Sequence, residues 1–241
     1  SDDSFENGFS FVLIPAFSNI LAEFALHPVK NFTNPLVGWV AGIDFSDLGK
    51  VKPKVIAGKP KLISDSVAIV LHAKLPADKI ALVEIYNNHE IGDGDIVQFT
   101  ESGFTCETCL INGEEHSLAE YIKSNPKLNG LPLMADYAGA KINVGVLEVS
   151  ADHKEVTFAA PVYPDTEYRF AKPIENKEDY YKRFPEIDDE IISSYNCVSN
   201  FLNFDLIGKS TGNITGPFTF GEIAYILLNE TMVYLKIENT D

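Results

Sequence analysis

The chain has 241 residues, a formal net charge of −16 from 35 acidic and 19 basic residues, and 45% hydrophobic residues. This length and composition are those of a folded protein with a dense core, which excludes an intrinsically disordered chain. A strongly negative chain repels nucleic-acid phosphates and anionic lipid headgroups, so we expect neither nucleic acid nor a membrane surface as a partner.

Cysteine usage and hydropathy bear on the compartment. The chain has three cysteines, Cys106, Cys109 and Cys197. They are too few for a disulfide framework in a chain of this length, which favours a reducing compartment. The apolar segment 8–26 is interrupted by Pro15, Ser18, Asn19 and Glu23, so it predicts a buried strand and an amphipathic helix instead of a membrane span. We therefore expect a soluble, cytoplasmic protein.

The N-terminal half alternates apolar runs with polar breaks. Four runs have the composition of strands: 9–14, 36–43, 67–72 and 80–86. Between the first two, Ser18 is placed to cap a helix that ends before Pro28. Farther along, Asn112-Gly113 is the strongest hairpin signal in the chain.

The C-terminal half continues the strand-rich pattern. Strands are predicted at 142–149, 155–160, near 191, and at 214–220 and 231–237, and the polar stretch 172–190 predicts an exposed helix or loop. The break at Gly130-Leu-Pro132 predicts two closely associated subdomains, 8–125 and 126–241. Strands outnumber helices without strict βα alternation, so the predicted fold class is α+β, with mixed, mostly antiparallel sheets and flanking helices.

The segment Cys106-Glu-Thr-Cys109 is a candidate metal or haem site. Leu110 stands where a c-type haem motif requires histidine, and His116 is the only nearby further zinc ligand. If Asn112-Gly113 forms a two-residue turn, Cys109 lies opposite His116. On one continuous strand the two thiols point to opposite faces unless a bulge intervenes. We therefore expect no metal here, and two buried cysteines.

No catalytic signature is present. The sequence lacks dinucleotide-binding, P-loop, nucleophile-elbow and kinase patterns, and Asp93 and Asp95 lie in a turn without the EF-hand spacing. The five histidines, His27, His72, His89, His116 and His153, show no metalloprotease-type pairing. We therefore predict a binding protein without a cofactor and not an enzyme.

An ordered series of short segments runs through the chain. They are Asn34-Pro-Leu-Val-Gly-Trp-Val-Ala-Gly42, Ser64-Asp-Ser-Val-Ala-Ile-Val70, Ser194-Tyr-Asn-Cys197, Gly216-Pro-Phe-Thr-Phe-Gly-Glu-Ile223 and Leu228-Asn-Glu-Thr-Met232. In this order they resemble the FIST sensory-domain family over about residues 9–240. Three positions depart from the family pattern: Trp39 replaces a glycine, Asn200 a frequent arginine and Leu228 a histidine.

The resemblance implies a non-catalytic sensing domain of signal transduction that binds a small molecule or a partner signalling protein. Some family members bind haem and sense nitric oxide, so a haem-linked sensor and a protein-interaction scaffold are the alternatives. The ligand site is expected at Cys197, Thr219, Glu222 and Asn229, on one concave surface. The alternative role for these polar residues is structural, with Glu222 and Asn229 satisfying backbone groups.

Overall fold

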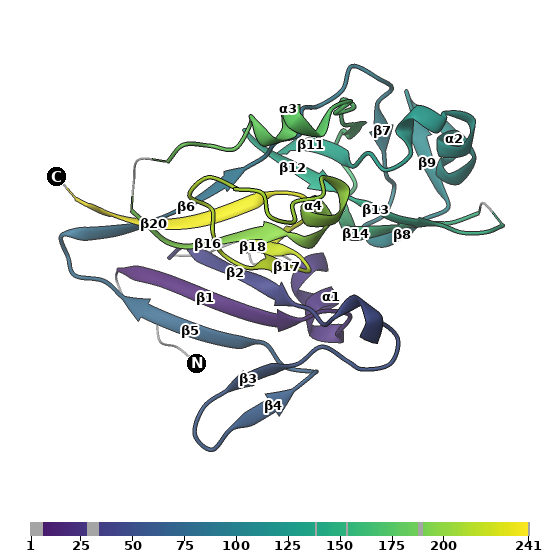
Figure 1. Ribbon diagram of the computed structural model, residues 1–241. Helices are drawn as coiled ribbons and strands as arrows, with labels where there is room; N and C mark the ends of the chain where they lie inside the picture. The colour runs from purple at the N-terminus through teal and green to yellow at the C-terminus, as the bar shows by residue number, and fades with distance from the viewer. Residues whose placement is uncertain (1–6, 28–33, 138, 153, 188–189, 241) are drawn as a thin grey trace. The chain divides into compact units, whose positions relative to one another are not determined.

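The computed structural model describes residues 7–27, 34–137, 139–152, 154–187 and 190–240, and Figure 1 shows its elements. The chain divides into two compact units. Unit 1 comprises Ser1–Tyr86, Phe184–Leu227 and Met232–Asp241, and unit 2 comprises Asn87–Arg183 and Leu228–Thr231. The predicted division at 125/126 therefore falls inside unit 2. Side chains from both sides of that point, such as Ile122 and Leu133, share one hydrophobic core, so the Gly-Leu-Pro break joins neighbours within a unit.

Unit 1 holds two sheets and a separate hairpin. Sheet A has the order β19-β18-β2-β1-β5, sheet C has the order β17-β16-β20-β6, and β3 pairs with β4 alone. The strands are β1 (Gly8–Pro15), β2 (Leu36–Ala41), β3 (Val55–Ala57), β4 (Leu62–Ser64), β5 (Ile69–Lys74), β6 (Lys79–Tyr86), β16 (Ile191–Cys197), β17 (Phe218–Thr219), β18 (Glu222–Ala224), β19 (Ile226–Leu228) and β20 (Met232–Asn239). The helices are α1 (Asn19–Leu26), α4 (Val198–Asn203) and the 3-10 turn η1 (Phe45–Asp47).

The N-terminal elements follow the sequence prediction closely. Strand β1 confirms the predicted run at 9–14, and Ser18 caps α1, its side chain accepting a hydrogen bond from the backbone of Leu21. Pro28, expected just after this helix, lies outside the described residues. Strand β1 pairs in parallel with β2 and antiparallel with β5, so it lies between strands from two different parts of the chain (Figure 1).

A glycine sets how closely β1 and β2 approach. Gly38 pairs with Val12, and a Cβ atom built on Gly38 would lie 1.9 Å from the carbonyl oxygen of Val12. Only a residue without a side chain fits at this distance. Neighbouring positions then fall into register, with Phe11 opposite Val37 and Leu13 opposite Trp39.

The longest pairing in sheet C is the antiparallel pair β20–β6. All eight residues of β20 pair with β6, from Met232 opposite Tyr86 to Asn239 opposite Lys79. On the other edge β20 pairs with β16, and β16 pairs in parallel with the short β17. The aliphatic and aromatic residues of this sheet are consistent with its burial, since Tyr195, Val233 and Leu235 are almost inaccessible to solvent.

Unit 2 is built from three small sheets around one core. Their orders are β10-β9-β7, β12-β11-β15 and β13-β14-β8. The strands are β7 (Val97–Gln98), β8 (Gly103–Cys106), β9 (Thr108–Ile111), β10 (Glu114–Ser117), β11 (Leu133–Tyr137), β12 (Ala140–Val144), β13 (Val146–Val149), β14 (Val156–Val162) and β15 (Arg169–Phe170). The helices are α2 (Leu118–Ser124), α3 (Lys177–Tyr181) and the 3-10 turn η2 (Pro126–Leu128). The predicted hairpin at 142–160 is β13–β14, but Gly145 divides its first strand into β12 and β13.

The Asn112-Gly113 hairpin is confirmed, and its register is the predicted one. Both residues have positive φ, as a tight turn of this kind requires, and Cys109 lies opposite His116. The predicted divergence of the two thiols assumed one continuous strand, and this condition is not met. The strand breaks at Glu107 between β8 and β9, and Cys106 and Cys109 are both buried in the unit 2 core. An interrupted strand no longer alternates its side chains, which is why counting positions failed.

The fold class is α+β, as predicted. Four α-helices accompany about 44% strand among the described residues, in sheets whose pairings are mostly antiparallel. Among the described strands the pairings of β1 with β2 and of β16 with β17 are parallel, as is the isolated bridge between Phe99 and Pro164. None of the helices in the described ranges is both long and apolar enough to span a membrane.

The close approach at Gly38 predicts a cost for adding one methyl group. We expect Gly38→Ala to lower the free energy of unfolding by about 1–3 kcal/mol or more, because the new Cβ collides with backbone that cannot rotate away. Gly94→Ala is the control, since nothing lies within 4 Å of a Cβ at that position. Urea unfolding followed by circular dichroism measures both, and equal stability of the two variants contradicts the assignment.

Candidate functional site

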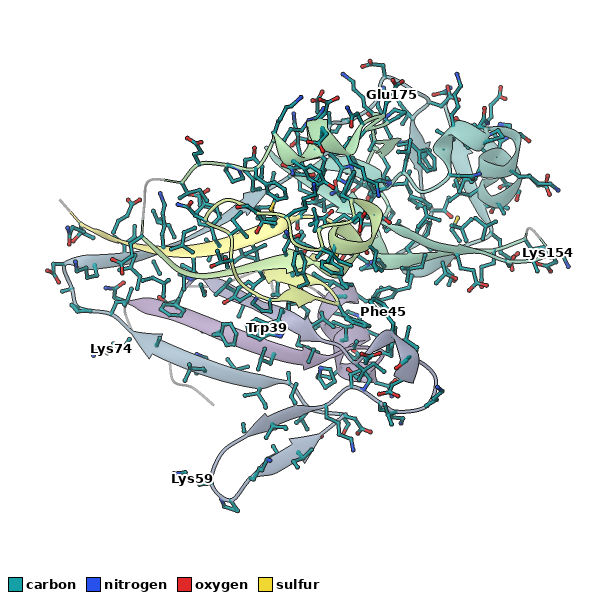
Figure 2. All side chains as sticks on the ribbon, viewed as in Figure 1. Trp39, Phe45, Lys59, Lys74, Lys154 and Glu175 are labelled. Carbon is teal, nitrogen blue, oxygen red and sulfur yellow. The ribbon has the colours of Figure 1, made fainter. Side chains whose placement is uncertain are left out.

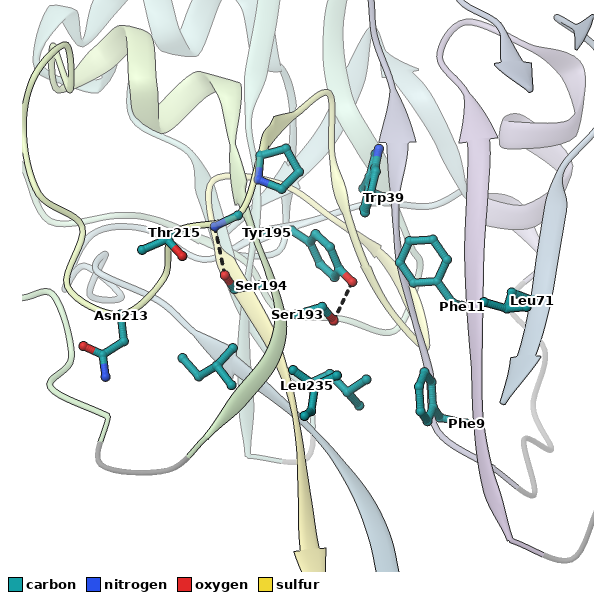
Figure 3. Close-up of a pocket in the computed structure, with 14 residues that line it drawn as sticks. Phe9, Phe11, Trp39, Leu71, Ser193, Ser194, Tyr195, Asn213, Thr215 and Leu235 are labelled. Atoms are coloured by element: carbon teal, nitrogen blue, oxygen red, sulfur yellow. Dashed lines mark hydrogen bonds between the residues drawn. The ribbon is translucent and has the colours of Figure 1, made fainter. Parts of the chain in front are cut away.

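A pocket of about 530 Å³ lies within unit 1, between side chains of sheet A and side chains of sheet C (Figure 3). Sheet A contributes residues of β1, β2 and β5, and sheet C contributes residues of β16 and β20. The lining residues are Phe9, Phe11, Trp39, Leu71, Ile191, Ile192, Ser193, Ser194, Tyr195, Asn213, Thr215, Gly216, Pro217 and Leu235. Its volume and mainly apolar wall are those of a small-molecule pocket.

Strand register explains why the apolar side chains face one way. Phe11 and Leu71 are directly opposite on β1 and β5, so both lie on the same face of sheet A. The next residue of β5, Val70, is opposite Val12 and therefore lies on the other face. Across the pocket Ser193 pairs with Leu235, and both face sheet A (Figure 3).

Three aromatic rings form the centre of the wall. The ring centroids of Phe11 and Trp39 are 5.1 Å apart in an edge-to-face arrangement, and those of Trp39 and Tyr195 are 4.8 Å apart. The centroids of Phe11 and Tyr195 are 6.0 Å apart. Such pairs hold each other in fixed orientations, so this part of the wall is pre-formed.

A few polar groups lie beside the aromatic wall. The Tyr195 hydroxyl donates a hydrogen bond of 2.7 Å to Ser193 Oγ, and the Gly216 backbone N–H donates one of 3.0 Å to Ser194 Oγ (Figure 3). Burial raises the pKa of Tyr195 to about 12, so its phenol keeps the proton at neutral pH. The pocket therefore offers neutral hydroxyl groups and no buried charge.

Three of the four predicted site residues lie together in unit 1, and they are buried. Cys197 pairs with Thr219 between β16 and β17. Thr219 Oγ1 lies 3.3 Å from Glu222 Oε1 and 3.0 Å from the Gly221 carbonyl oxygen. None of the residues lining the 530 Å³ pocket is among the three. They form a buried cluster next to the pocket strands.

Asn229, the fourth predicted residue, belongs to unit 2. Its amide oxygen accepts a hydrogen bond of 2.7 Å from the Gly145 backbone N–H, and its amide nitrogen donates one of 3.1 Å to the Asn143 carbonyl oxygen. It thus supports the chain where Gly145 separates β12 from β13. A Cβ on Gly145 would lie 3.0 Å from Asn229 Oδ1, so the position is tightly enclosed. These bonds favour the structural alternative for Asn229.

A second buried pair in unit 2 was not singled out in the sequence. His89 and Glu230 are almost fully buried, with 3.5 Å between Nε2 and Oε2. Burial raises the pKa of Glu230 to about 7, while burial and the nearby Arg183 lower the pKa of His89 to about 4. The distance would suit an ion pair, but burial acts on both groups, so the neutral forms are favoured. Glu230 also has a positive φ of 55°, uncommon outside glycine.

The described residues contain no candidate metal site. No group of three or more His, Cys, Asp or Glu side chains in that part of the chain is placed to hold an ion. The three cysteines are buried and form no disulfide, and His153 lies outside the described residues. The Cys106 thiol donates toward the Thr108 carbonyl oxygen, 3.1 Å away.

The pocket residues could have been found only in part from the sequence. Alternation along 9–14 places Phe9 and Phe11 on one face of their strand, but only the register of β1 with β5 brings Leu71 to the same face. No periodicity indicates that this face meets Ser193 and Tyr195, which are more than 100 residues away in the chain. The sequence prediction instead chose residues of the C-terminal strands, such as Thr219, Glu222 and Asn229, and these side chains are buried.

Comparison with known proteins gives one match. The chain belongs to a family described as "Family of unknown function (DUF6976)", whose model matches residues 1–238. No curated protein and no solved structure matches the chain. The resemblance to FIST domains therefore stays a prediction.

The bonds of Asn229 predict a stability effect. We expect Asn229→Ala to lower the free energy of unfolding by about 1–3 kcal/mol, because a buried N–H and a buried carbonyl lose their partner. Asn129→Ala, at an exposed position of the same unit, should change it by less than about 0.5 kcal/mol. Chemical denaturation compares the two. A neutral Asn229→Ala would leave the ligand-binding reading of this residue standing.

The raised pKa of Glu230 predicts a pH-dependent difference. The folded protein holds this proton up to about pH 7, whereas the unfolded chain releases it near its ordinary value of 4.5. Stability from this group is therefore lost as pH rises from about 4.5 to 7. As the pH rises from 5 to 8, the free energy of unfolding of Glu230→Gln should increase by on the order of 2–3 kcal/mol relative to that of the wild type. His89 titrates in both proteins, so its opposite contribution largely cancels in this comparison.

The matched control for that experiment is Glu175→Gln, an exposed carboxyl in unit 2. Its stability difference from the wild type should stay constant over the same pH range. Denaturation curves at several pH values measure both variants. A Glu230→Gln difference that does not change with pH would show that the carboxylate is already charged when folded.

Proposed function

We propose that this protein is a non-catalytic small-molecule binding domain, and that its ligand occupies the aromatic pocket of unit 1. The observation that carries the proposal is a 530 Å³ hollow between two sheets, walled by Phe11, Trp39 and Tyr195. The hollow is open to solvent, since Leu71 and Ile192 in its wall are 61% and 48% exposed, so a small molecule can reach the aromatic side chains. The ligand class that suits the wall is a neutral, apolar or aromatic molecule with a hydroxyl or carbonyl group.

The polar groups of the pocket support this ligand class. Ser193 and Tyr195 already share a hydrogen bond, and each hydroxyl has further capacity to accept or donate. The backbone at Gly216 is held close, since a Cβ there would lie 1.6 Å from the Ser194 carbonyl oxygen. A few fixed polar groups on an apolar wall orient a ligand without requiring it to be charged.

The FIST-like segments also support a sensing role. Trp39 belongs to the N-terminal segment, Ser194 and Tyr195 to the segment ending at Cys197, and Gly216 and Pro217 to the C-terminal one; all five line the pocket. Segments far apart in the sequence thus meet at the proposed site. We propose a cytoplasmic sensor whose partner is a small molecule, and three buried cysteines without a disulfide are in keeping with a reducing compartment.

Fluorescence tests the proposal directly, because Trp39 is the only tryptophan of the chain. We expect the dye 8-anilinonaphthalene-1-sulfonate to quench Trp39 by energy transfer when it binds. Leu71→Asp should weaken its binding about tenfold or more, since a charge then replaces apolar wall. Leu71 is 61% exposed, so the variant should still fold. Native mass spectrometry of the protein purified from cells then identifies a co-purifying ligand.

Val70→Asp is the control. Val70 is the next residue of the same strand and is 48% exposed, but it lies on the other face of sheet A and does not line the pocket. Its dye affinity should match that of the wild type within about twofold, a difference well below the loss of an apolar contact. Equal losses in both variants, or dye binding that leaves Trp39 unquenched, would contradict the pocket as the binding site.

A further inference from the structure

The segment 48–64 reverses the charge of the chain locally. It contains Lys50, Lys52, Lys54, Lys59 and Lys61 and no acidic residue, although acidic residues outnumber basic ones by 35 to 19 in the whole chain. All five lysines are exposed. Lys50 Nζ donates to the Ser46 carbonyl oxygen, and none of the five forms an ion pair with a carboxylate of the described residues. Five cations thus follow one another within 12 residues of sequence, between Asp47 on one side and Asp65 on the other.

The same segment exposes large aliphatic side chains. Ile56 and Ile63 are directly opposite across the β3–β4 hairpin, and they are 53% and 52% exposed. Leu62 is also exposed, and as the neighbour of Ile63 on one strand it lies on the other face of the hairpin. Only the base is anchored in unit 1, where Val55 is buried. Lys59 lies at the hairpin turn (Figure 2).

The chain leading into the hairpin extends this surface. Leu48 and Val51 are exposed, and a hollow of about 620 Å³ beside them is lined by Lys50 and Lys52. Phe17 lines the same hollow with 71% of its surface exposed. Aliphatic groups, an aromatic ring and ammonium groups are therefore interspersed on one region of unit 1.

We propose that the β3–β4 hairpin and the segment 48–53 form a docking surface for an anionic lipid membrane. The exposed aliphatic side chains enter the boundary between headgroups and acyl chains, and the lysines reach the anionic headgroups. Each lysine near an anionic surface contributes on the order of 1 kcal/mol, so five give a binding that is appreciable and reversible. The hollow is of a size to receive a headgroup, and its lining contains two lysines, Lys50 and Lys52, against one carboxylate, Asp65.

The arrangement fits lipid better than an acidic protein. Apolar side chains on both faces of a two-stranded hairpin cannot all be covered by one rigid partner surface, whereas lipid surrounds an inserted hairpin. Lysine-rich surfaces with interspersed aliphatic and aromatic groups are typical of interfacial membrane binding.

The overall negative charge does not prevent this docking. Interactions between exposed charges are screened beyond about 8 Å at physiological ionic strength, so the membrane responds mainly to the nearest charges. The sequence-based expectation that no membrane surface is bound rested on the charge of the whole chain. Segment 48–64 is positively charged although the chain as a whole is negative.

Vesicle co-sedimentation of the full chain tests the proposal. We expect binding to phosphatidylcholine vesicles that contain phosphatidylserine, little binding to pure phosphatidylcholine, and release when salt is raised from about 0.1 M to 1 M. Lys59→Glu/Lys61→Glu should weaken binding about tenfold or more. Ile56→Ser/Ile63→Ser should also weaken it, by removing the inserted groups, and at low salt should retain part of the electrostatic binding.

Matched controls separate this surface from general effects. Lys123→Glu/Lys127→Glu changes the net charge equally at exposed lysines of unit 2, and Leu202→Ser/Ile207→Ser removes exposed aliphatic groups elsewhere in unit 1. Both should bind as the wild type does. Equal binding to neutral and anionic vesicles overturns the proposal, as do equal losses in control and test variants. So does a wild type that ignores vesicles but binds poly-glutamate or RNA through the same lysines.

Discussion

The contact of Gly38 with the backbone of Val12 sets the geometry on which unit 1 depends. It lets β1 and β2 run side by side in parallel, and the register then fixes which side chains of three strands share a face. Phe11 and Leu71 face the same way because they are directly opposite, and Trp39 joins them from β2. The aromatic wall of the pocket is thus a consequence of strand pairing, and its orientation is fixed by backbone hydrogen bonds instead of flexible loops.

Polar groups in this protein divide into two kinds by their surroundings. Thr219 with Glu222 in unit 1, and Asn229 with Gly145 in unit 2, are enclosed and bonded to nearby chain. Such groups hold strand ends in place, because leaving them without partners in the interior is costly. The hydroxyls of Ser193 and Tyr195 differ, since they border open space. A neighbouring cavity, and not burial alone, therefore sets the proposed site apart.

Charge is unevenly distributed along the chain. The acidic average describes most of the chain, yet segment 48–64 is basic and exposes aliphatic groups. This segment and the aromatic pocket both belong to unit 1. With the proposed ligand pocket and the proposed membrane-docking surface on one unit, that unit would meet an apolar ligand at the membrane, where apolar molecules concentrate.

The sequence by itself determined the fold class, the first strand, the Ser18 cap and the Asn112-Gly113 hairpin with Cys109 opposite His116. These depend on neighbours a few residues apart, where periodicity and turn chemistry act directly. Only the tertiary structure decided that Cys106 and Cys109 share a core, that unit 2 spans the predicted boundary, and that Tyr195 meets Phe11 and Trp39. Each of these depends on a strand break or on contacts between distant segments, and hydrophobic pattern specifies which face is buried but not what covers it.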